Sequence, residues 1–527
     1  MRFIPVRMKD NLLPIFLLLL IVTIFLCSRL FKLDQVPVAL YWDEASIGYN
    51  AYSVLKTGTD EWGKFLPIHF KAFGEYKLPV YIYTVSFFES LLGLNTIAIR
   101  LPAVLFSLGT LLMIFLLVKS FFSDVKLALI ATFIFTITPW LFIFSRTGYE
   151  ATAGLFFILL GIYFFFMYEK NPLFFVSSAA SFLLSIYSYN SFRILLPFIG
   201  LWFLVYLIYK KKLFIRRNLV FVLAALAIFI VGCIPIINLY MSSDGLERFN
   251  DVGIYKLGES RKLALTTFAS NYVEHFNPSF LFLNGDQNLR SHTGGVGEFY
   301  WLSFPFILIG LIVCLKYHKS SHLFILFLLL ISPIPAAITK EAPHALRALF
   351  MIVPLSILTA IGIQVFCKKV HFRNHLLLAI LFLFTFLFTL YLAKFFSTYS
   401  TMSAQSWQGE YKQVFDIYGE SFSHYDYVVV SDRYAQPYVF YLNYRQLDPT
   451  YFQMNKQLNE LPRSETSVVR SIGNVVFDDV LIDTLPKGRL LLFAHPEEEL
   501  RDVRAIQTIW NPDKTVAFYV YEYTKDN

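Results

Sequence analysis

The sequence predicts an α-helical polytopic membrane protein that crosses the bilayer about eleven times and ends in a small α/β domain. Composition is the first reason: of 527 residues, 56% are hydrophobic and 18% are aromatic. The mean hydropathy of +0.56 is also far above that of soluble domains. The second reason is that long apolar stretches recur over most of the chain, and the third is a change after Phe396 to short strand-like runs separated by helical segments.

Eleven apolar stretches are long enough to be expected as membrane-spanning helices. They lie at residues 12–30, 101–118, 127–144, 151–168, 172–187, 194–209, 218–240, 300–315, 322–338, 346–366 and 376–393. Basic residues fall in alternate loops, and the positive-inside rule then places the N-terminus in the cytoplasm. The basic residues on that side are Lys119 with Lys126, Lys170, Lys210 to Lys212 with Arg216 and Arg217, Lys316 with Lys319, and Lys368 with Lys369 and Arg373.

Residues 80–95 are apolar but short, so we expect an amphipathic helix at the membrane interface. A true span there would invert the downstream topology. The first apolar stretch follows a basic segment and lacks a small-residue cleavage site, so an uncleaved anchor is expected. The four cysteines lie in or beside apolar runs without metal-ligand spacing, which argues against a disulfide framework or a zinc site; they are Cys27, Cys233, Cys314 and Cys367.

Two domains are expected: a transmembrane domain at 1–395, with its first extracytoplasmic loop at 31–99, and an extracytoplasmic α/β domain at 396–527. No fixed-period repeat and no Gly-rich phosphate loop occurs in the sequence, which argues against a nucleotide-hydrolysing pump. The net charge of +8 is spread among short loops, which argues against nucleic acid as a partner. The C-terminal pattern predicts strands at Tyr427–Val430, Arg489–Phe493 and Thr515–Tyr523, and a helix at Glu497–Val503.

A pair of carboxylates, Asp43 and Glu44, follows the first span. Ionisable groups near a bilayer are costly and tend to mark functional sites. The pattern predicts a helix that begins at Asp43 and stops at Gly58, so Asp43 has the N-cap as an alternative role. Two adjacent carboxylates at a helix start are also suited to removing a proton from a hydroxyl or to binding a divalent cation. We therefore regard Asp43 and Glu44 as candidate catalytic residues.

Glu75 and Lys77 lie further along the same loop. The ammonium group of Lys77 is a candidate for supplying positive charge to a phosphate, and Glu75 is a second candidate substrate-binding residue. The alternative for Lys77 is that its side chain extends toward lipid headgroups, as lysines at an interface commonly do.

Other charged residues open or close spans on the predicted outer side. Arg146, Arg193 and Arg347 are candidates for binding a lipid-linked phosphate bidentately, although arginines at such places also serve as headgroup anchors. His292 lies in a polar, glycine-rich loop at 286–297 that suits a mobile substrate-binding segment or a simple turn.

Four segments together resemble the GT-C membrane glycosyltransferases, and more narrowly the bacterial relatives of protein O-mannosyltransferases and of lipid A aminoarabinose transferases. They are Trp-Asp-Glu at 42–44, Gly-Thr-Asp-Glu-Trp-Gly at 58–63, Glu-Tyr-Lys-Leu-Pro-Val-Tyr at 75–81 and Arg-Leu-Pro at 100–102. The resemblance covers about residues 10–370 and implies a GT-C fold.

The resemblance also implies the chemistry. Asp43 would be the catalytic acidic residue, Lys77 would bind the donor phosphate, and Glu150 would match a second acidic position that can share a metal with Asp43. The donor would be a polyprenyl-phosphate sugar used outside the cytoplasm, and inversion is expected from a single displacement. The acceptor would be a protein, a lipid or a polysaccharide, and a divalent metal is the only cofactor that the family leaves open.

Two other functions fit a multi-span protein. A transporter or lipid flippase predicts charges near the bilayer midplane and broken helices in matching halves, whereas the charges here cluster at the ends of the spans. A non-catalytic scaffold would instead use the C-terminal domain to bind a cell-wall partner. The charge pattern favours the transferase.

Overall fold

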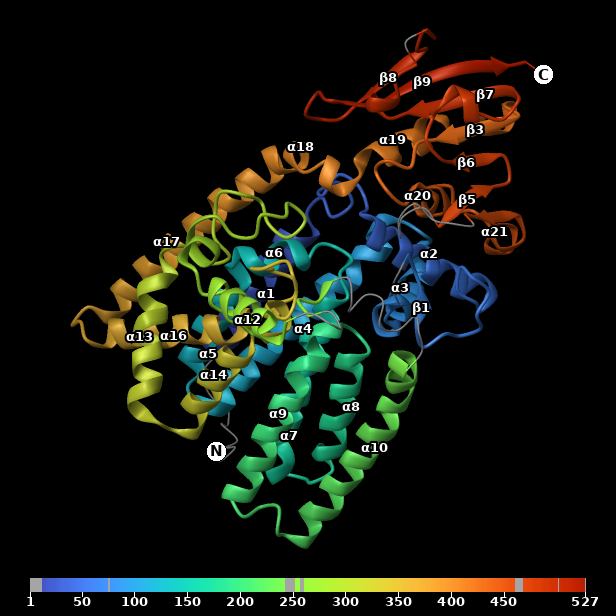
Figure 1. The fold of residues 1–527 in the computed structure, drawn as a ribbon. Helices are drawn as coiled ribbons and strands as arrows, with labels where there is room; N and C mark the ends of the chain where they lie inside the picture. Colours follow the sequence, from blue (N-terminus) through green and yellow to red (C-terminus); the bar gives the residue numbers. More distant parts are fainter. Residues whose placement is uncertain are drawn as a thin grey trace. The chain divides into compact units, whose positions relative to one another are not determined.

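The computed structural model describes residues 12–73, 76–241, 252–255, 260–459, 468–500 and 502–526. The chain forms two compact units (Figure 1). The first, which we call the membrane unit, comprises Met1–Phe31 and Ala103–Ala393, and the second, which we call the loop unit, comprises Lys32–Pro102 and Lys394–Asn527. The first loop therefore groups with the C-terminal residues.

Eight helical segments among the described residues are long and apolar enough to cross a membrane: Leu12–Leu30, Thr96–Phe122, Ala151–Glu169, Asn190–Tyr209, Arg216–Met241, Ser320–Ala337, Leu349–Lys368 and Arg373–Met402. Three shorter apolar helices are Val125–Ile137, Phe174–Ile186 and Ser303–Tyr317. Each of the eleven predicted stretches overlaps one of these helices, eight of which are long enough to span. The predicted fold class, a polytopic helical membrane protein, is confirmed.

The helices of the membrane unit begin and end as follows. They are α1 (Leu12–Leu30), the greater part of α4 (Thr96–Phe122), α5 (Val125–Ile137), α6 (Pro139–Phe144), α7 (Ala151–Phe166), α8 (Phe174–Ile186), α9 (Asn190–Tyr209), α10 (Arg216–Met241), α12 (Arg261–Glu274), α13 (Ser303–Tyr317), α14 (Ser320–Ile331), α15 (Ile334–Ala337), α16 (Ile352–Lys368) and α17 (Arg373–Lys394). Figure 1 shows α7, α8 and α10 side by side, and α8 packs against both α7 and α10.

Helix α16 belongs to the most buried span of the membrane unit, Leu349–Lys368. Its span is 89% buried, whereas the span of α10 is only 6% buried. Two glycines allow α16 to approach α13 closely: a Cβ at Gly310 would collide with the backbone of Leu358, and one at Gly362 would collide with the backbone of Phe306. Small residues permit such contacts in a lipid environment, where dispersion and not hydrophobic burial drives helix association.

The loop unit contains the first loop and a mixed sheet. The first loop forms α2 (Trp42–Thr57), β1 (Phe70–Lys71), β2 (Tyr76–Lys77) and α3 (Pro79–Leu92). The apolar stretch at 80–95 is thus a 14-residue helix, too short to belong to the eight spans. The C-terminal helices are α18 (Ser400–Met402), α19 (Gly409–Tyr418), α20 (Pro437–Tyr444) and α21 (Pro449–Asn455).

The sheet has the strand order β4-β5-β6-β3-β7-β9-β8. Strand β3 pairs in parallel with β6 and β7, and the other pairs are antiparallel. The three predicted strands are confirmed as β3, β7 and β9. The strands are β3 (Tyr427–Val430), β4 (Lys456–Leu458), β5 (Val469–Ile472), β6 (Val475–Phe477), β7 (Gly488–Ala494), β8 (Gln507–Trp510) and β9 (Val516–Lys525).

The predicted helix at Glu497–Val503 is wrong. Among its described residues, only a short 3-10 turn at Pro496–Glu498 forms there. Its acidic side chains bind Arg433 instead, since Arg433 donates to Glu498 at 3.0 Å and to Glu497 at 2.9 Å. The backbone N–H of Leu500 donates to a tyrosine hydroxyl on β9. Tertiary contacts therefore override the local preference for a helix.

The first loop packs on the C-terminal helices within the loop unit. The hydroxyl of Tyr49 on α2 donates to the carbonyl of Leu447 at 2.9 Å. The amide of Asn443 on α20 donates to the carbonyl of Ala45 at 3.1 Å. Two hydrogen bonds thus tie the first half of α2 to the C-terminal segment, and such support helps to hold a side chain of α2 in place.

Candidate active site

Asp43 lies in the first turn of α2. Helix α2 begins at Trp42 after the N-cap residue Tyr41, and it ends at Thr57 before the C-cap residue Gly58, whose φ of 72° is the left-handed conformation typical of a helix stop. The N-cap alternative for Asp43 is therefore wrong. The position remains favourable for a carboxylate because the helix dipole and the unsatisfied N–H groups of the first turn stabilise negative charge.

Lys77 is the partner of Asp43. The Nζ atom lies 2.6 Å from Oδ1 of Asp43, and strand β2 holds Lys77 in register with Phe70 on β1. The Lys77 side chain is 4% exposed, whereas that of Asp43 is 25% exposed. The ammonium is therefore buried behind a carboxylate that a ligand can still reach.

Glu44 and Arg100 form a buried ion pair beside the first loop. Both side chains are fully buried. Arg100 Nε and Nη2 donate to the two carboxylate oxygens of Glu44 at 2.9 and 3.1 Å. Its remaining N–H groups donate to the carbonyls of Leu33, Pro37 and Ala39. All five N–H groups of the guanidinium are thus used, which fixes the path of the chain from Leu33 to the start of α2.

The Glu44 carboxylate also closes the first turn of α2. It accepts a hydrogen bond from the backbone N–H of Tyr41 at 3.2 Å. Asp43 and Glu44 are adjacent in sequence but point to different surroundings, because one side chain pairs with a lysine from β2 and the other with an arginine from α4. These contacts favour a positioning role for Glu44.

Glu61 is a buried carboxyl group that sequence reasoning missed. It lies in the turn at 58–63 and is inaccessible to solvent. Burial, with a smaller contribution from the charge of Asp60, raises its pKa to about 8, while Lys77 acts in the opposite direction. Its backbone N–H donates to Asn50 on α2 at 3.1 Å. The only sequence signal was the acidic pair in the Gly-Thr-Asp-Glu-Trp-Gly segment.

Glu75 lies outside the described residues. Apart from Lys77, the other predicted substrate-binding residues belong to the membrane unit. Arg146 is fully buried and donates to the carbonyls of Ser28, Arg29 and Phe31, the last turn of α1 and the residue after it. Arg193 donates to the carbonyl of Ile186 at the end of α8 and to the hydroxyl of Tyr240. Both arginines therefore hold helix ends.

Arg29 is a further buried cation that the sequence analysis did not single out. Its guanidinium donates to Ser145 and to the carbonyl of Thr136, and it lies over the rings of Phe25 and Phe142. Together with Arg146, it ties α1 to the turn between α6 and α7 in the membrane unit. The sequence signal was its position at the end of the first apolar stretch.

Two segments of the membrane unit that are far apart in sequence meet at Asp286. This carboxylate accepts from the backbone N–H of Ala345 at 2.7 Å and of Asn288 at 2.9 Å. The buried Glu298 accepts from the N–H of Asp286 at 3.0 Å. The loop at 286–297 and the segment around 344–347 are thus joined, although sequence reasoning had named them separately.

A group of basic side chains lies beside this junction. The His344 N–H donates to Nε2 of His275 at 3.2 Å. Burial is the main cause that lowers the pKa of His344, and Arg347 is the next. Arg347 itself donates to Thr339 at 2.9 Å. His292 is buried, and its Nδ1 accepts from the N–H of Gly294 at 3.0 Å.

The metal prediction names Asp43 and Glu150. Glu150 lies at the N-cap of α7 in the membrane unit, without a side-chain cap hydrogen bond, whereas Asp43 belongs to the loop unit. Among the described ranges, no group of three or more His, Cys, Asp or Glu side chains has the arrangement of a metal site. Lys77 occupies one carboxylate oxygen of Asp43, Oδ1.

The fold is that of the GT-C membrane glycosyltransferases, as the resemblance implied. The ArnT protein from Cupriavidus metallidurans is similar in its apo structure, with 11% identity over 96% of this chain and 97% of that one, and a TM-score of 0.57. Its structure bound to undecaprenyl phosphate matches with 10% identity, the same coverage and a TM-score of 0.57.

The oligosaccharyltransferase from Archaeoglobus fulgidus, tethered with an acceptor peptide, is also similar, with 15% identity and a TM-score of 0.52. This match covers 82% of the chain but only 63% of the archaeal protein. Another structure of that enzyme contains zinc and sulfate. No protein-family model and no curated protein sequence matches the chain. At these identities, the comparisons define the fold.

Proposed function

We propose that this protein transfers a sugar from a polyprenyl-phosphate donor to an acceptor hydroxyl at the first-loop site. The observation that carries the proposal is the Asp43–Lys77 pair, a reachable carboxylate against a buried ammonium. The GT-C fold supports it, and so do the similar structures, which contain undecaprenyl phosphate in ArnT and dolichol phosphate in the archaeal enzyme. Both are lipid-linked phosphates of the kind that the proposal requires.

The pair explains how one site can serve both substrates. Before the donor binds, Asp43 and Lys77 neutralise each other. The phosphate of the donor would take over the Lys77 ammonium, which releases the Asp43 carboxylate. Asp43 then accepts the proton of the acceptor hydroxyl as its oxygen attacks the anomeric carbon, and the bond from that carbon to the phosphate oxygen breaks. Lys77 stabilises the negative charge of the departing polyprenyl phosphate.

A single displacement of this kind inverts the anomeric centre. A lipid phosphate is already a good leaving group, so alignment of the two substrates is the main task of the protein. Glu44 and Arg100 contribute by fixing the start of α2. The glycosyl acceptor is a protein, a lipid or a polysaccharide of the cell envelope.

The protein is a multi-pass membrane protein by its helices and its fold. We propose that its N-terminus is cytoplasmic and that the loop unit is extracytoplasmic. This orientation would give the first loop access to a donor in the outer leaflet. It follows from the distribution of lysines and arginines among the loops.

Asp43→Asn tests the proposed function in cells that lack the native gene. Mass analysis of envelope glycans and glycoproteins should show a sugar that the native chain restores and Asp43→Asn does not. Asp34→Asn, an exposed carboxylate in the same loop, is the matched control and should restore the sugar. Equal amounts of each variant must be present in the membrane fraction. Full restoration by Asp43→Asn would refute the role of Asp43 as base and favour transport.

A further inference from the structure

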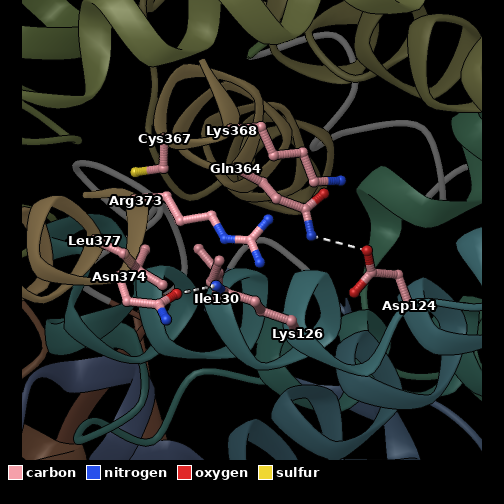
Figure 2. Close-up of a pocket in the computed structure, with 9 residues that line it drawn as sticks. All are labelled: Asp124, Lys126, Ile130, Gln364, Cys367, Lys368, Arg373, Asn374 and Leu377. Atoms are coloured by element: carbon pink, nitrogen blue, oxygen red, sulfur yellow. Dashed lines mark hydrogen bonds between the residues drawn. The ribbon is translucent and has the colours of Figure 1, made fainter. Parts of the chain in front are cut away.

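A cavity of about 230 Å³ lies in the membrane unit, where the turn between α4 and α5 meets the turn between α16 and α17. Its lining comes from three helices and one turn: Asp124, Lys126, Ile130, Gln364, Cys367, Lys368, Arg373, Asn374 and Leu377. Figure 2 shows the Arg373 guanidinium among these side chains. None of them belongs to the first-loop site.

The cavity is basic. Three cationic side chains line it, Lys126, Lys368 and Arg373, against a single carboxylate, Asp124. The carboxylate is occupied, because it accepts from the Gln364 amide at 2.8 Å (Figure 2) and from the N–H of Leu127 at 2.9 Å. Two cations of the lining, Lys368 and Arg373, are exposed and form no ion pair with any described residue. The cavity therefore has an excess of positive charge.

The cavity also has an apolar side and lies at the end of membrane spans. Ile130 and Leu377 contribute apolar surface to the lining. The span of α16 ends at Lys368, and the span of α17 begins at Arg373. Between and beside them, Phe366 and Phe372 are 40% and 61% exposed, as expected for aromatic side chains at a membrane interface. A ligand here meets cations and hydrocarbon together.

We propose that this cavity binds the phosphate headgroup of an anionic membrane phospholipid. The phosphate would lie between Lys368 and Arg373, with the glycerol and the first methylene groups against Ile130 and Leu377. Basic pockets between transmembrane helices are suited to such headgroups because the charge and the hydrocarbon of the lipid are satisfied at once. The positive-inside pattern places this site in the cytoplasmic leaflet, on the opposite side from the proposed transfer reaction.

Native mass spectrometry of the purified full chain, titrated with phosphatidylglycerol, tests the proposal. Lys368→Gln combined with Arg373→Gln should weaken binding of the tightest phosphatidylglycerol by about thirtyfold, because each basic side chain near the surface contributes about fivefold. Both side chains are exposed, so the folded state should persist. Phosphatidylcholine should bind weakly to both proteins.

Lys210→Gln combined with Lys211→Gln is the matched control. It removes the same charge from another predicted cytoplasmic loop outside the cavity, and it should change the affinity by no more than about twofold. Equal losses for the two double variants would overturn the proposal in favour of general surface attraction. No loss for the cavity variant would also overturn it.

Inorganic phosphate distinguishes a lipid headgroup from a free anion. It should fail to displace phosphatidylglycerol from the native protein, since it lacks the acyl chains and glycerol that contact the apolar side. Displacement by inorganic phosphate at comparable concentration would identify the cavity as a soluble-anion site, and the lipid proposal would then be wrong.

Discussion

Arg100→Met offers the sharpest test of how the first loop is held. Native Arg100 makes five hydrogen bonds, two of them to the buried carboxylate of Glu44. The substitution leaves that carboxylate without its cation and three carbonyls without a donor. Breaking a buried pair by removing one partner costs about 3–5 kcal/mol, since the remaining charge stays desolvated. The path of the chain from Leu33 to the start of α2 should open locally.

Hydrogen exchange followed by mass spectrometry measures this opening. A loss of about 3–5 kcal/mol corresponds to amide exchange faster by roughly a hundredfold to a few thousandfold in peptides spanning residues 33–57. Peptides from α13 and α16 should keep their protection. Arg470→Met, which removes an exposed arginine of the loop unit, is the control and should leave residues 33–57 unchanged.

The double variant Arg100→Met with Glu44→Leu separates the cost of the unpaired Glu44 carboxylate from the cost of the three carbonyls that lose their donors. It removes the unpaired buried carboxylate as well as the guanidinium, so part of the lost protection should return. Unchanged exchange in Arg100→Met would refute the idea that this ion pair holds the first loop. Identical exchange in the single and double variants would show that the carbonyl contacts, and not the pair with Glu44, are responsible.

Two other predictions concern the same loop. Lys77→Ala should weaken binding of a polyprenyl-phosphate donor more than binding of the acceptor, because the ammonium is proposed to contact phosphate; separate titrations measure this, and equal losses would contradict it. Burial raises the pKa of Glu61 from its ordinary value of 4.5 to about 8. The stability that its protonated form contributes should therefore be present below about pH 4.5 and lost as the pH rises toward about 8. Glu61→Gln should flatten this dependence in thermal unfolding, and an unchanged profile would show that Glu61 is not the titrating group.

The sequence predicted the membrane architecture well. The thickness of the bilayer sets how long an apolar stretch must be to span it, and the length of a stretch is visible in the sequence. Each of the eleven stretches could therefore be found without a structure. The three predicted strands were found for a similar reason, since short runs of apolar, β-branched and aromatic residues are local signals. The helix at Glu497–Val503 was wrong because tertiary contacts override its local preference; among them are the contacts of its acidic side chains with Arg433, more than sixty positions away, and of the Leu500 N–H with Tyr521.

In the candidate site, too, some features are visible in the sequence and others depend on tertiary contacts. The sequence by itself determined that Asp43, Glu44 and Lys77 lie in one loop after the first span, since a charge beside a long apolar stretch is visible in the chain. Only the tertiary structure decided that Asp43 pairs with Lys77, that Glu44 pairs with Arg100 and that Glu61 is buried. The sequence does not show whether a carboxylate is solvated, paired or buried. Its environment depends on side chains that folding brings from distant positions.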